Sequence, residues 1–378
     1  ISGVLTEYTF GASGGVDGKS LTEGVSIAGE KLRLRLPLCS RGEKGIMTPN
    51  VPGLDEFRPM SAASMPQSDA SMAASGNLMY AGSASSPISA VNGTTDHAAM
   101  NTMSWSADGI SIDSRKINSG DLFIALRGDN HDGHDHIAQA AKHGAVAAII
   151  SQPVDTDLPT IMVSDTMQAC EQLAMAARQR HQGKRIAITG SVGKTGTRML
   201  VAKALACYGT THFSEGNLNN HIGAPLSLAR MPASCDFGVF ELGMNHAGEL
   251  SPLSQLIAPD IAVITTIADS HIGHFNSLND IAMAKAEIFD GLAHPDSAGI
   301  AMINTRDQFT PPLDQKAHDA GGKTVLRFGF SDDAEYQLIS VKRHAEGITA
   351  EANIRGEPIR FSLGMMAAHW ADAGLIAL

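Results

Sequence analysis

The sequence predicts an α/β fold in which a small α/β domain precedes a larger domain built on a mostly parallel sheet with an antiparallel addition. Apolar, strand-like segments alternate with helix-like segments between residues 110 and 304. A glycine-rich turn, "TGSVGKT", joins one strand to a helix, and short strand-like segments follow one another after residue 323. Such alternation favours a parallel sheet with helices on both faces.

Length and composition limit the possible classes of protein. The 378 residues are typical of two or three domains, and the net charge of −11 disfavours nucleic-acid partners and anionic membranes. The four cysteines are scattered without a C-x-x-C pair, so we expect reduced thiols in a cytoplasmic protein. No apolar run approaches the roughly 18 residues that a membrane span needs. The first residue is Ile1 rather than methionine, so we expect a fragment.

Residues 1–103 differ in composition from the rest. Serine, alanine, methionine and glycine dominate residues 61–90, which carry almost no charge. This composition is typical of a disordered or low-complexity extension. The earlier segment "EKLRLRLPL" alternates leucine with charge and is compatible with an isolated strand. No residue in this region indicates a chemical role.

Residues 104–183 are expected to form the small domain. "DLFIAL", "VAAIIS" and "TIMVSD" indicate strands, and "HDHIAQAAKHGA" indicates a helix that ends at Gly144. Asp165 is a suitable N-cap for the helix "MQACEQLAMAARQRHQ". The domain is expected to end near Gly183.

Residues 184–378 are expected to form the larger domain. Apolar strands recur at "RIAITG", "FGVFELG", "IAVITTIA" and "AGIAMIN", with helices between them. From residue 324 the segments "TVLRFGF", "EYQLISVKR", "GITAEANI" and "EPIRFSLG" predict an antiparallel addition. The chain stops at "HWADAGLIAL", within a helix-like segment.

The turn at residues 189–195 indicates a phosphate-binding loop. Backbone N–H groups at a helix N-terminus point toward an anion, and the helix dipole favours negative charge there. Lys194 would neutralise phosphate charge, and the Thr195 hydroxyl would hold Mg²⁺. The usual pattern, G-x-x-x-x-G-K-[ST], has glycine where this chain has Ile188. A tight strand-to-helix turn with a chance Gly-Lys-Thr is the structural alternative.

Other polar residues follow the strands of this domain. Glu241 ends an apolar strand, where ligands of open α/β sheets gather and where a carboxylate suits Mg²⁺. His271 or His274 follows the next strand and Lys285 lies on the helix after it, although a structural histidine and a solvated lysine are the alternatives. Asn304 ends "AGIAMIN", in a suitable place for a base or ribose.

The segment "GNLNNHIGAPLSLAR" places three asparagines and two glycines before a helix. Side-chain amides both donate and accept hydrogen bonds, and glycine allows a close approach of the backbone. A ligand contact and a capped turn are the two interpretations.

These segments, in this order, resemble the Mur ligases, the ATP-dependent amide-bond-forming enzymes of peptidoglycan synthesis. The family's loop is T-G-[ST]-x-G-K-T, which residues 189–195 match, so the missing glycine is a family variant. "SIDSRKINSGDLFIAL" and its continuation to residue 150 resemble the UDP-sugar-binding domain of the third and fourth ligases. "GNLNNHIGAPL", "ELGMNHAGEL" and "HIGHFNSLNDIAMAKAEIF" resemble the fourth, which adds D-alanyl-D-alanine.

The resemblance implies a reaction in two steps. ATP phosphorylates the terminal carboxylate of UDP-N-acetylmuramoyl-tripeptide, and the amine of D-alanyl-D-alanine then displaces the phosphate. By similarity, Thr195 and Glu241 hold one Mg²⁺ ion, while His271 and a carbamylated Lys285 hold a second. Lys194, His271 and Lys285 are the implied catalytic residues.

The resemblance also implies the contacts with ATP and with the UDP-linked substrate. The residues expected to contact ATP are Gly190, Ser191, Val192, Gly193, Lys194, Thr195, Gly196 and Asn304. Those expected to contact the UDP-linked substrate are Ser114, Arg115, Asn219 and Asn220. A cytoplasmic monomer without nucleic-acid or membrane partners is expected.

The sequence departs from the family at three places. Gly196 interrupts the usual G-K-T-[ST]-[ST] and is expected to loosen the helix start by up to about 1 kcal/mol. Near the end, "GMMAAHWADAG" keeps His369 but has Ala373 where asparagine is expected. The family's C-terminal domain, which closes over ATP and receives the amine, is absent, so we expect this chain alone to be inactive.

Two alternatives therefore stand beside the ligase interpretation. One is a truncated, catalytically incompetent form that binds only the UDP-linked precursor and ATP. The other is a sibling Mur ligase that adds the third residue, against which "GNLNNHIG" and "AKAEIF" speak.

Overall fold

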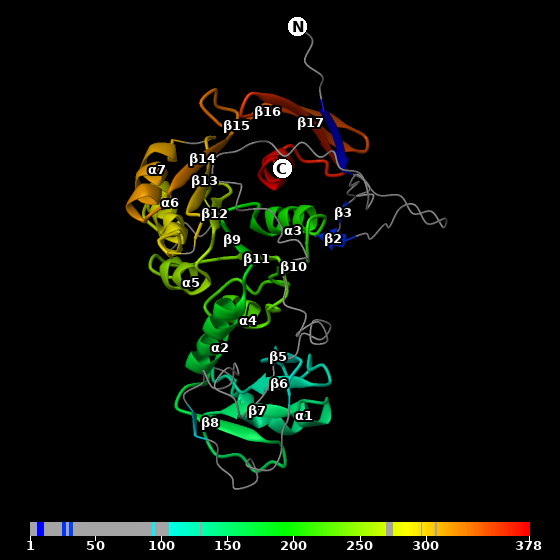
Figure 1. Cartoon of the computed structure of the whole chain (residues 1–378), viewed down its shortest axis with the longest axis vertical. Coiled ribbons are helices and arrows are strands. Elements are labelled where there is room, and N and C mark those ends of the chain that lie inside the picture. Colours follow the sequence, from blue (N-terminus) through cyan, green and yellow to red (C-terminus); the bar gives the residue numbers. More distant parts are fainter. Residues whose placement is uncertain are drawn as a thin grey trace, which may run out of the picture. The chain divides into compact units, whose positions relative to one another are not determined.

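The computed structural model describes residues 106–128, 131–269, 275–295, 297–306 and 308–378, and the backbone of four short strands before them. These strands are β1 (Thr6–Phe10), β2 (Val25–Ile27), β3 (Glu30–Leu32) and β4 (Gly93–Thr94). The rest of the expected extension over residues 1–103 lies outside the described residues. The chain divides into two compact units, which can be followed by colour in Figure 1.

One unit contains residues 106–183 and 214–235 and is built on a parallel sheet. Its parallel strands are, in order across the sheet, β5 (Gly109–Ser111), β6 (Asp121–Ile124), β7 (Ala147–Ile150) and β8 (Thr160–Val163). β4 pairs antiparallel with β8 at the edge. Every residue of β6 and β7 is buried, as expected for apolar runs in a parallel sheet.

The helices of this unit confirm the expected alternation. Between residues 106 and 183 they are the 3₁₀ helix η3 (Gly133–His136), α1 (Ile137–Lys142) and α2 (Thr166–Arg180). Gly144 follows α1 with φ of 103°, a left-handed conformation that glycine adopts without strain. The Asp165 side chain accepts hydrogen bonds from the backbone N–H groups of Met167 at 2.7 Å and Gln168 at 3.1 Å, so it is the N-cap of α2.

A later segment, residues 214–235, completes the same unit. Its helix α4 (Gly223–Ala229) is buried at every residue and packs against α2. The Arg180 guanidinium donates to the carbonyl of Met231 at 3.0 Å, and the Arg230 guanidinium donates to the carbonyl of Ile110 at 2.7 Å. The boundary expected near Gly183 would place residues 214–235 in the second domain, whereas in the structure they pack with the first unit.

The other unit contains residues 184–213 and 236–378 and is built on one long sheet. Its parallel part has the order β10 (Thr211–Phe213), β11 (Phe237–Glu241), β9 (Lys184–Thr189), β12 (Ile261–Ile264), β13 (Ile300–Asn304), β14 (Thr324–Gly329). β14 pairs parallel with both β13 and β15, so the prediction of an antiparallel strand is wrong for "TVLRFGF". The antiparallel addition consists of β15 (Tyr336–His344), β16 (Gly347–Ile354) and β17 (Glu357–Leu363). β1 pairs parallel with β17.

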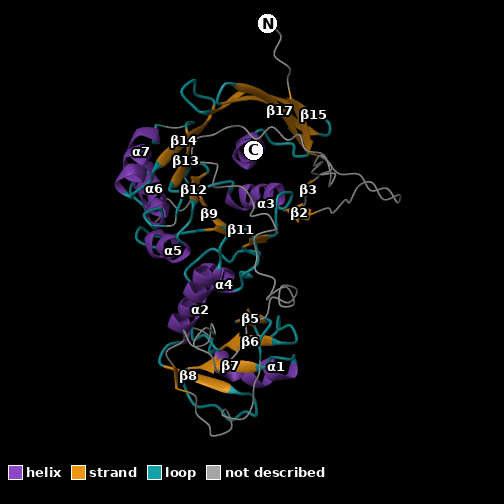
Figure 2. Ribbon diagram, viewed as in Figure 1, coloured by secondary structure: helices purple, strands orange, loops and turns teal. Residues whose placement is uncertain are grey.

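Helices cover both faces of the parallel part, as Figures 1 and 2 show. One face carries α3 (Lys194–Leu205) and α8 (Trp370–Ala377). The other carries α5 (Leu250–Ile257), α6 (Leu278–Ala286), the 3₁₀ helix η5 (Glu287–Gly291) and α7 (Thr310–Asp319). In the described residues, no helix is both long and apolar enough to cross a membrane.

The strand order places a topological switch at β9. After β9 the chain forms β10 and β11 on one side of β9 in the strand order, and then crosses to β12 on the other side of β9. Ligands of open α/β sheets bind outside the carboxyl ends of the strands at such a point. The register sets Glu241 opposite Ile188 and Ile264 opposite Thr189, so the ends of all three strands meet at one edge.

Replacing Asp165 by alanine should lower the free energy of unfolding by about 1 kcal/mol, because two N–H groups at the start of α2 lose their acceptor. Urea denaturation followed by circular dichroism measures the change. Asp165→Asn should keep most of the stability, and Asp157→Ala, at an exposed position, serves as the control. Equal stability of Asp165→Ala and Asp157→Ala would contradict the capping role.

Candidate active site

The glycine-rich loop between β9 and α3 forms the centre of the site. Gly190 has φ of 149° and Gly193 has φ of 89°, both within the region that favours glycine. A Cβ atom on Gly190 would lie 2.0 Å from the Oγ1 atom of Thr265, so no other residue fits there. The N–H groups at the start of α3 therefore follow a turn that only this glycine pattern allows.

The segment after β12 fastens this loop. The Thr265 hydroxyl donates to the carbonyl of Val192 at 2.7 Å. The Ser191 N–H donates to the carbonyl of Thr266 at 2.7 Å, and the Ser191 hydroxyl donates to the carbonyl of Ala268 at 2.9 Å. Thr265 was not among the predicted site residues, and its only sequence signal is a hydroxyl directly after an apolar strand.

Lys194 opens α3 and bends back over the loop. Its Nζ atom donates to the carbonyl of Gly190 at 2.7 Å. Burial lowers the pKa of Lys194, and the nearby Glu241 carboxylate opposes that shift. The ammonium is thus held beside the N–H groups of the helix start, where it would meet phosphate oxygens.

Glu241 lies at the end of β11 and is 2 % exposed. Arg198, one helical turn after Lys194, approaches it with its Nη1 atom 3.5 Å from the Glu241 Oε2 atom. Burial lowers the pKa of Arg198, and the Glu241 carboxylate opposes this. Arg198 was not predicted, although its i, i+4 spacing from Lys194 places both side chains on one face of α3.

Lys285, on α6, is 1 % exposed. Burial and, to a smaller extent, the positive charge of Lys194 together lower its pKa to about 7. The alternative of a solvated helix lysine is therefore wrong. A substantial neutral fraction near pH 7 makes this amine a nucleophile, which is the form that carbamylation requires.

The donor atoms suit magnesium rather than a softer metal. Within the described ranges, no three His, Cys, Asp or Glu side chains gather to form a metal cluster. Thr195 and Glu241 offer a hydroxyl and a carboxylate, hard oxygen donors of the kind Mg²⁺ takes alongside water and phosphate. His271 lies in residues 270–274, outside the described residues.

Asn304 ends β13 at the same edge and is 3 % exposed. Its side-chain amide donates to the carbonyl of Thr265 at 2.7 Å and accepts from the N–H of Arg306 at 2.9 Å. The side chain therefore links the ends of β12 and β13. A pocket of about 350 Å³ lies next to it, with Thr305 and Thr310 in its lining.

The four residues predicted to contact the UDP-linked substrate belong to the other unit. Ser114 is buried and its hydroxyl donates to the Oε1 atom of Gln139 at 2.9 Å, whereas Arg115 is exposed. The Arg115 guanidinium bonds both carboxylate oxygens of Asp113, at 2.8 and 2.9 Å, and this bond lowers the pKa of Asp113 to about 2.

Asn220 accepts hydrogen bonds from the N–H groups of Ile222 at 3.2 Å and Gly223 at 2.9 Å. These bonds satisfy N–H groups at the start of α4, as the capped-turn interpretation expects. A role of Asn220 in substrate binding stays a prediction. The Asn219 N–H donates to the carbonyl of Asn217 at 2.8 Å within the same turn.

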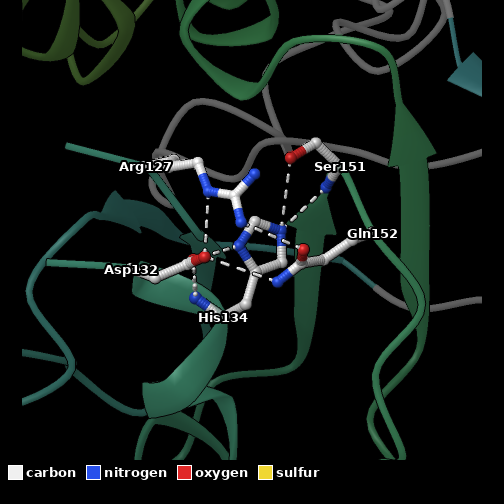
Figure 3. Close-up of polar contacts among 5 residues, drawn as sticks. All are labelled: Arg127, Asp132, His134, Ser151 and Gln152. Atoms are coloured by element: carbon white, nitrogen blue, oxygen red, sulfur yellow. Dashed lines mark hydrogen bonds and ion pairs between the residues drawn. The ribbon is translucent and has the colours of Figure 1, made fainter. Parts of the chain in front are cut away.

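A polar cluster around the buried His134, shown in Figure 3, was not predicted. The His134 Nε2 atom accepts from the N–H of Ser151 at 2.8 Å, so the ring proton lies on Nδ1. Nδ1 then donates to the Asp132 Oδ1 atom at 2.5 Å, and Arg127 approaches the other oxygen at 3.1 Å. Because both ring nitrogens are engaged, the cluster fixes the loop before η3 to the end of β7.

Two family models match the chain. The Mur ligase middle domain matches residues 188–378, and the Mur ligase family catalytic domain matches residues 106–182. The structure of MurF from Acinetobacter baumannii is similar, with a TM-score of 0.68, 27 % identity, and coverage of 79 % of this chain and 64 % of that one.

Relatives of known name also match. A UDP-N-acetylmuramoyl-tripeptide–D-alanyl-D-alanine ligase from Rickettsia prowazekii is 36 % identical over 70 % of this chain and 58 % of its own length. The ligase of that name from Escherichia coli is 42 % identical over 52 % of this chain and 43 % of its own length. The chain thus spans about half the length of the curated relatives it matches. Since the middle-domain model alone covers half of it, the chain belongs to the Mur ligase family.

Proposed function

We propose that the protein is an ATP-dependent ligase that joins D-alanyl-D-alanine to UDP-N-acetylmuramoyl-tripeptide in peptidoglycan synthesis. The observation that carries the proposal is the loop of residues 190–193, fastened to β12 and flanked by Lys194, Glu241 and the buried Lys285. The names of the Rickettsia prowazekii and Escherichia coli relatives support the choice of substrates.

The chemistry requires negative groups to meet. In the first step, a carboxylate oxygen of the tripeptide bonds to the γ-phosphorus of ATP, and the bond from that phosphorus to the bridging oxygen of ADP breaks. In the second, the amine attacks the acyl carbon, loses a proton and releases phosphate. Fixed positive groups are the main help a site can give to such a transfer, and Lys194 with the N–H groups of α3 supplies them.

We assign Thr195 and Glu241 to one Mg²⁺ ion, and His271 with a carbamylated Lys285 to a second. When bound, the ions would neutralise phosphate charge. Carbamylation would convert the Lys285 amine into an oxygen donor, and its low pKa supports that step. Asn304, next to the pocket lined by Thr305 and Thr310, is assigned to the adenosine.

We assign Ser114, Arg115, Asn219 and Asn220 to the UDP-linked substrate. The exposed guanidinium of Arg115 is suited to a diphosphate, once it exchanges the bond to Asp113 for one to the ligand. We further expect a cytoplasmic monomer without nucleic-acid or membrane partners, in line with the net charge of −11.

The proposal is tested by phosphate release from ATP in the presence of tripeptide precursor and D-alanyl-D-alanine, using the whole product of the reading frame that holds this chain. Lys194→Ala should lower kcat/KM by about a hundredfold or more, because transition-state charge loses its partner. Lys203→Ala, on the same helix, is the control. Phosphate release that does not depend on D-alanyl-D-alanine would contradict the proposed reaction, and dipeptide precursor as substrate would favour the sibling ligase.

Replacing Glu241 by glutamine should raise the Mg²⁺ concentration needed for half-maximal ADP binding by about tenfold, because a neutral amide is a poorer ligand for a hard cation. Calorimetric titrations with ADP at several Mg²⁺ concentrations measure this. Glu346→Gln, at an exposed turn, is the matched control. An unchanged Mg²⁺ requirement would exclude Glu241 from the metal site.

Carbamylation of Lys285 should depend on pH in a defined direction. With a pKa of about 7, the amine is about half neutral at pH 7 and about nine-tenths neutral at pH 8, and only the neutral amine adds CO₂. Carbon-13 NMR with labelled bicarbonate should show a carbamate signal that grows between pH 6 and pH 8. The signal should be absent from Lys285→Arg, and its persistence there would assign it to another amine.

A further inference from the structure

Gly196, where the chain departs from the family pattern, is covered by an aromatic ring. The residue lies in the first turn of α3 and is buried. A Cβ atom there would lie 2.2 Å from the Cη2 atom and 2.3 Å from the Cζ3 atom of Trp370. The indole thus occupies the volume that any larger residue at 196 would need. Glycine at position 196 is expected to destabilise the start of α3, but it also permits a packing contact with Trp370 that a larger residue would prevent.

Trp370 opens α8, which is held firmly on its other side. A Cβ atom on Gly374 would lie 2.5 Å from the ring of Phe361 in β17, so helix and strand are in close contact. Ala371 and Leu375 are fully buried in the core between α8 and the sheet. Figure 1 shows α8 between α3 and the antiparallel strands. The indole can therefore move away from Gly196 only if the packing of α8 changes.

A second contact joins α8 to the other end of the candidate nucleotide site. The guanidinium of Arg306 forms a fork with the Asp372 carboxylate, at 2.8 and 3.1 Å. The backbone N–H of Arg306 is held by the side chain of Asn304 at 2.9 Å. The first turn of α8 thus contacts both the phosphate end of the site, where Trp370 covers Gly196, and the Asn304 end, where Asp372 binds Arg306.

We propose that Trp370 is a positioning residue matched to Gly196: its indole sets the first turn of α3, and with it Lys194 and Thr195, and nucleotide binding is transmitted through this contact to α8. The inference rests on the proposed function, since it assumes that the loop binds a nucleotide. A displacement of reacting groups by about 1 Å costs up to a hundredfold in rate, so a side chain that fixes this turn has a large effect without touching the ligand.

A double-mutant cycle tests the match. Gly196→Ala should weaken ADP binding in the presence of Mg²⁺ by about tenfold or more, because ring and methyl group cannot share the space. Trp370→Ala should weaken it by about threefold, and the double variant should bind within about threefold of Trp370→Ala, because the cavity then admits the methyl group. Trp370→Phe, which keeps a ring, should bind like the parent. Equal effects of Gly196→Ala in both backgrounds would overturn the inference.

Fluorescence gives a readout that a purely structural role would leave unchanged. The chain has two tryptophans, so Trp105→Phe leaves Trp370 as the sole indole emitter. ADP with Mg²⁺ should change its emission with the same Kd as calorimetry gives, and Lys194→Ala should remove the response. If calorimetry shows ADP binding but the emission of Trp370 does not change, the inference is overturned while the proposed function stands. Absence of binding by the parent chain would overturn the proposed function and the inference together.

Discussion

The close approach of Gly190 to Thr265 is the constraint on which the rest of the site depends. Because residue 190 has no side chain, the Thr265 hydroxyl reaches across the loop to the carbonyl of Val192. The carbonyl of Thr265 in turn accepts from Asn304. One residue after β12 therefore joins the loop after β9 to the end of β13. The N–H groups that would face a phosphate are fixed by bonds within the protein, so little ordering remains for the ligand to impose.

The positive side chains at this edge of the sheet are suited to binding an anionic ligand. Lys194, Arg198 and Lys285 come from two helices into a largely buried region, where the Glu241 carboxylate lies near Lys194 and Arg198. Burial and mutual repulsion disfavour the charged forms, which is why the pKa of Lys285 falls to about 7. A bound polyphosphate would reduce the repulsion among these positive side chains. The repulsion in the free protein therefore favours binding of an anionic ligand.

Local patterns were sufficient for much of the fold. Apolar runs predicted the strands of both sheets, Asp165 predicted the start of α2, and the glycine pattern predicted the loop, because each depends on neighbours in sequence. Residues 214–235 pack with the first compact unit through the contact of α4 with α2, a long-range contact that local sequence patterns do not reveal. The expected domain boundaries near residues 103 and 183 stay predictions. Likewise, helix propensity alone gave Gly196 a destabilising role, since nothing near it in sequence reveals Trp370. The assigned roles of Ser114, Arg115, Asn219 and Asn220 stay predictions.

The return of α4 to the first unit also has a consequence for the order of folding. During synthesis the chain emerges from its N-terminus, so α2 is complete long before residues 223–229 exist. Until then, the apolar face of α2 and the guanidinium of Arg180 lack the partners that they have in the finished protein. β9, the phosphate loop and α3 are made in that interval. The packing of the first unit is therefore completed only after the glycine-rich loop and α3 have been synthesised.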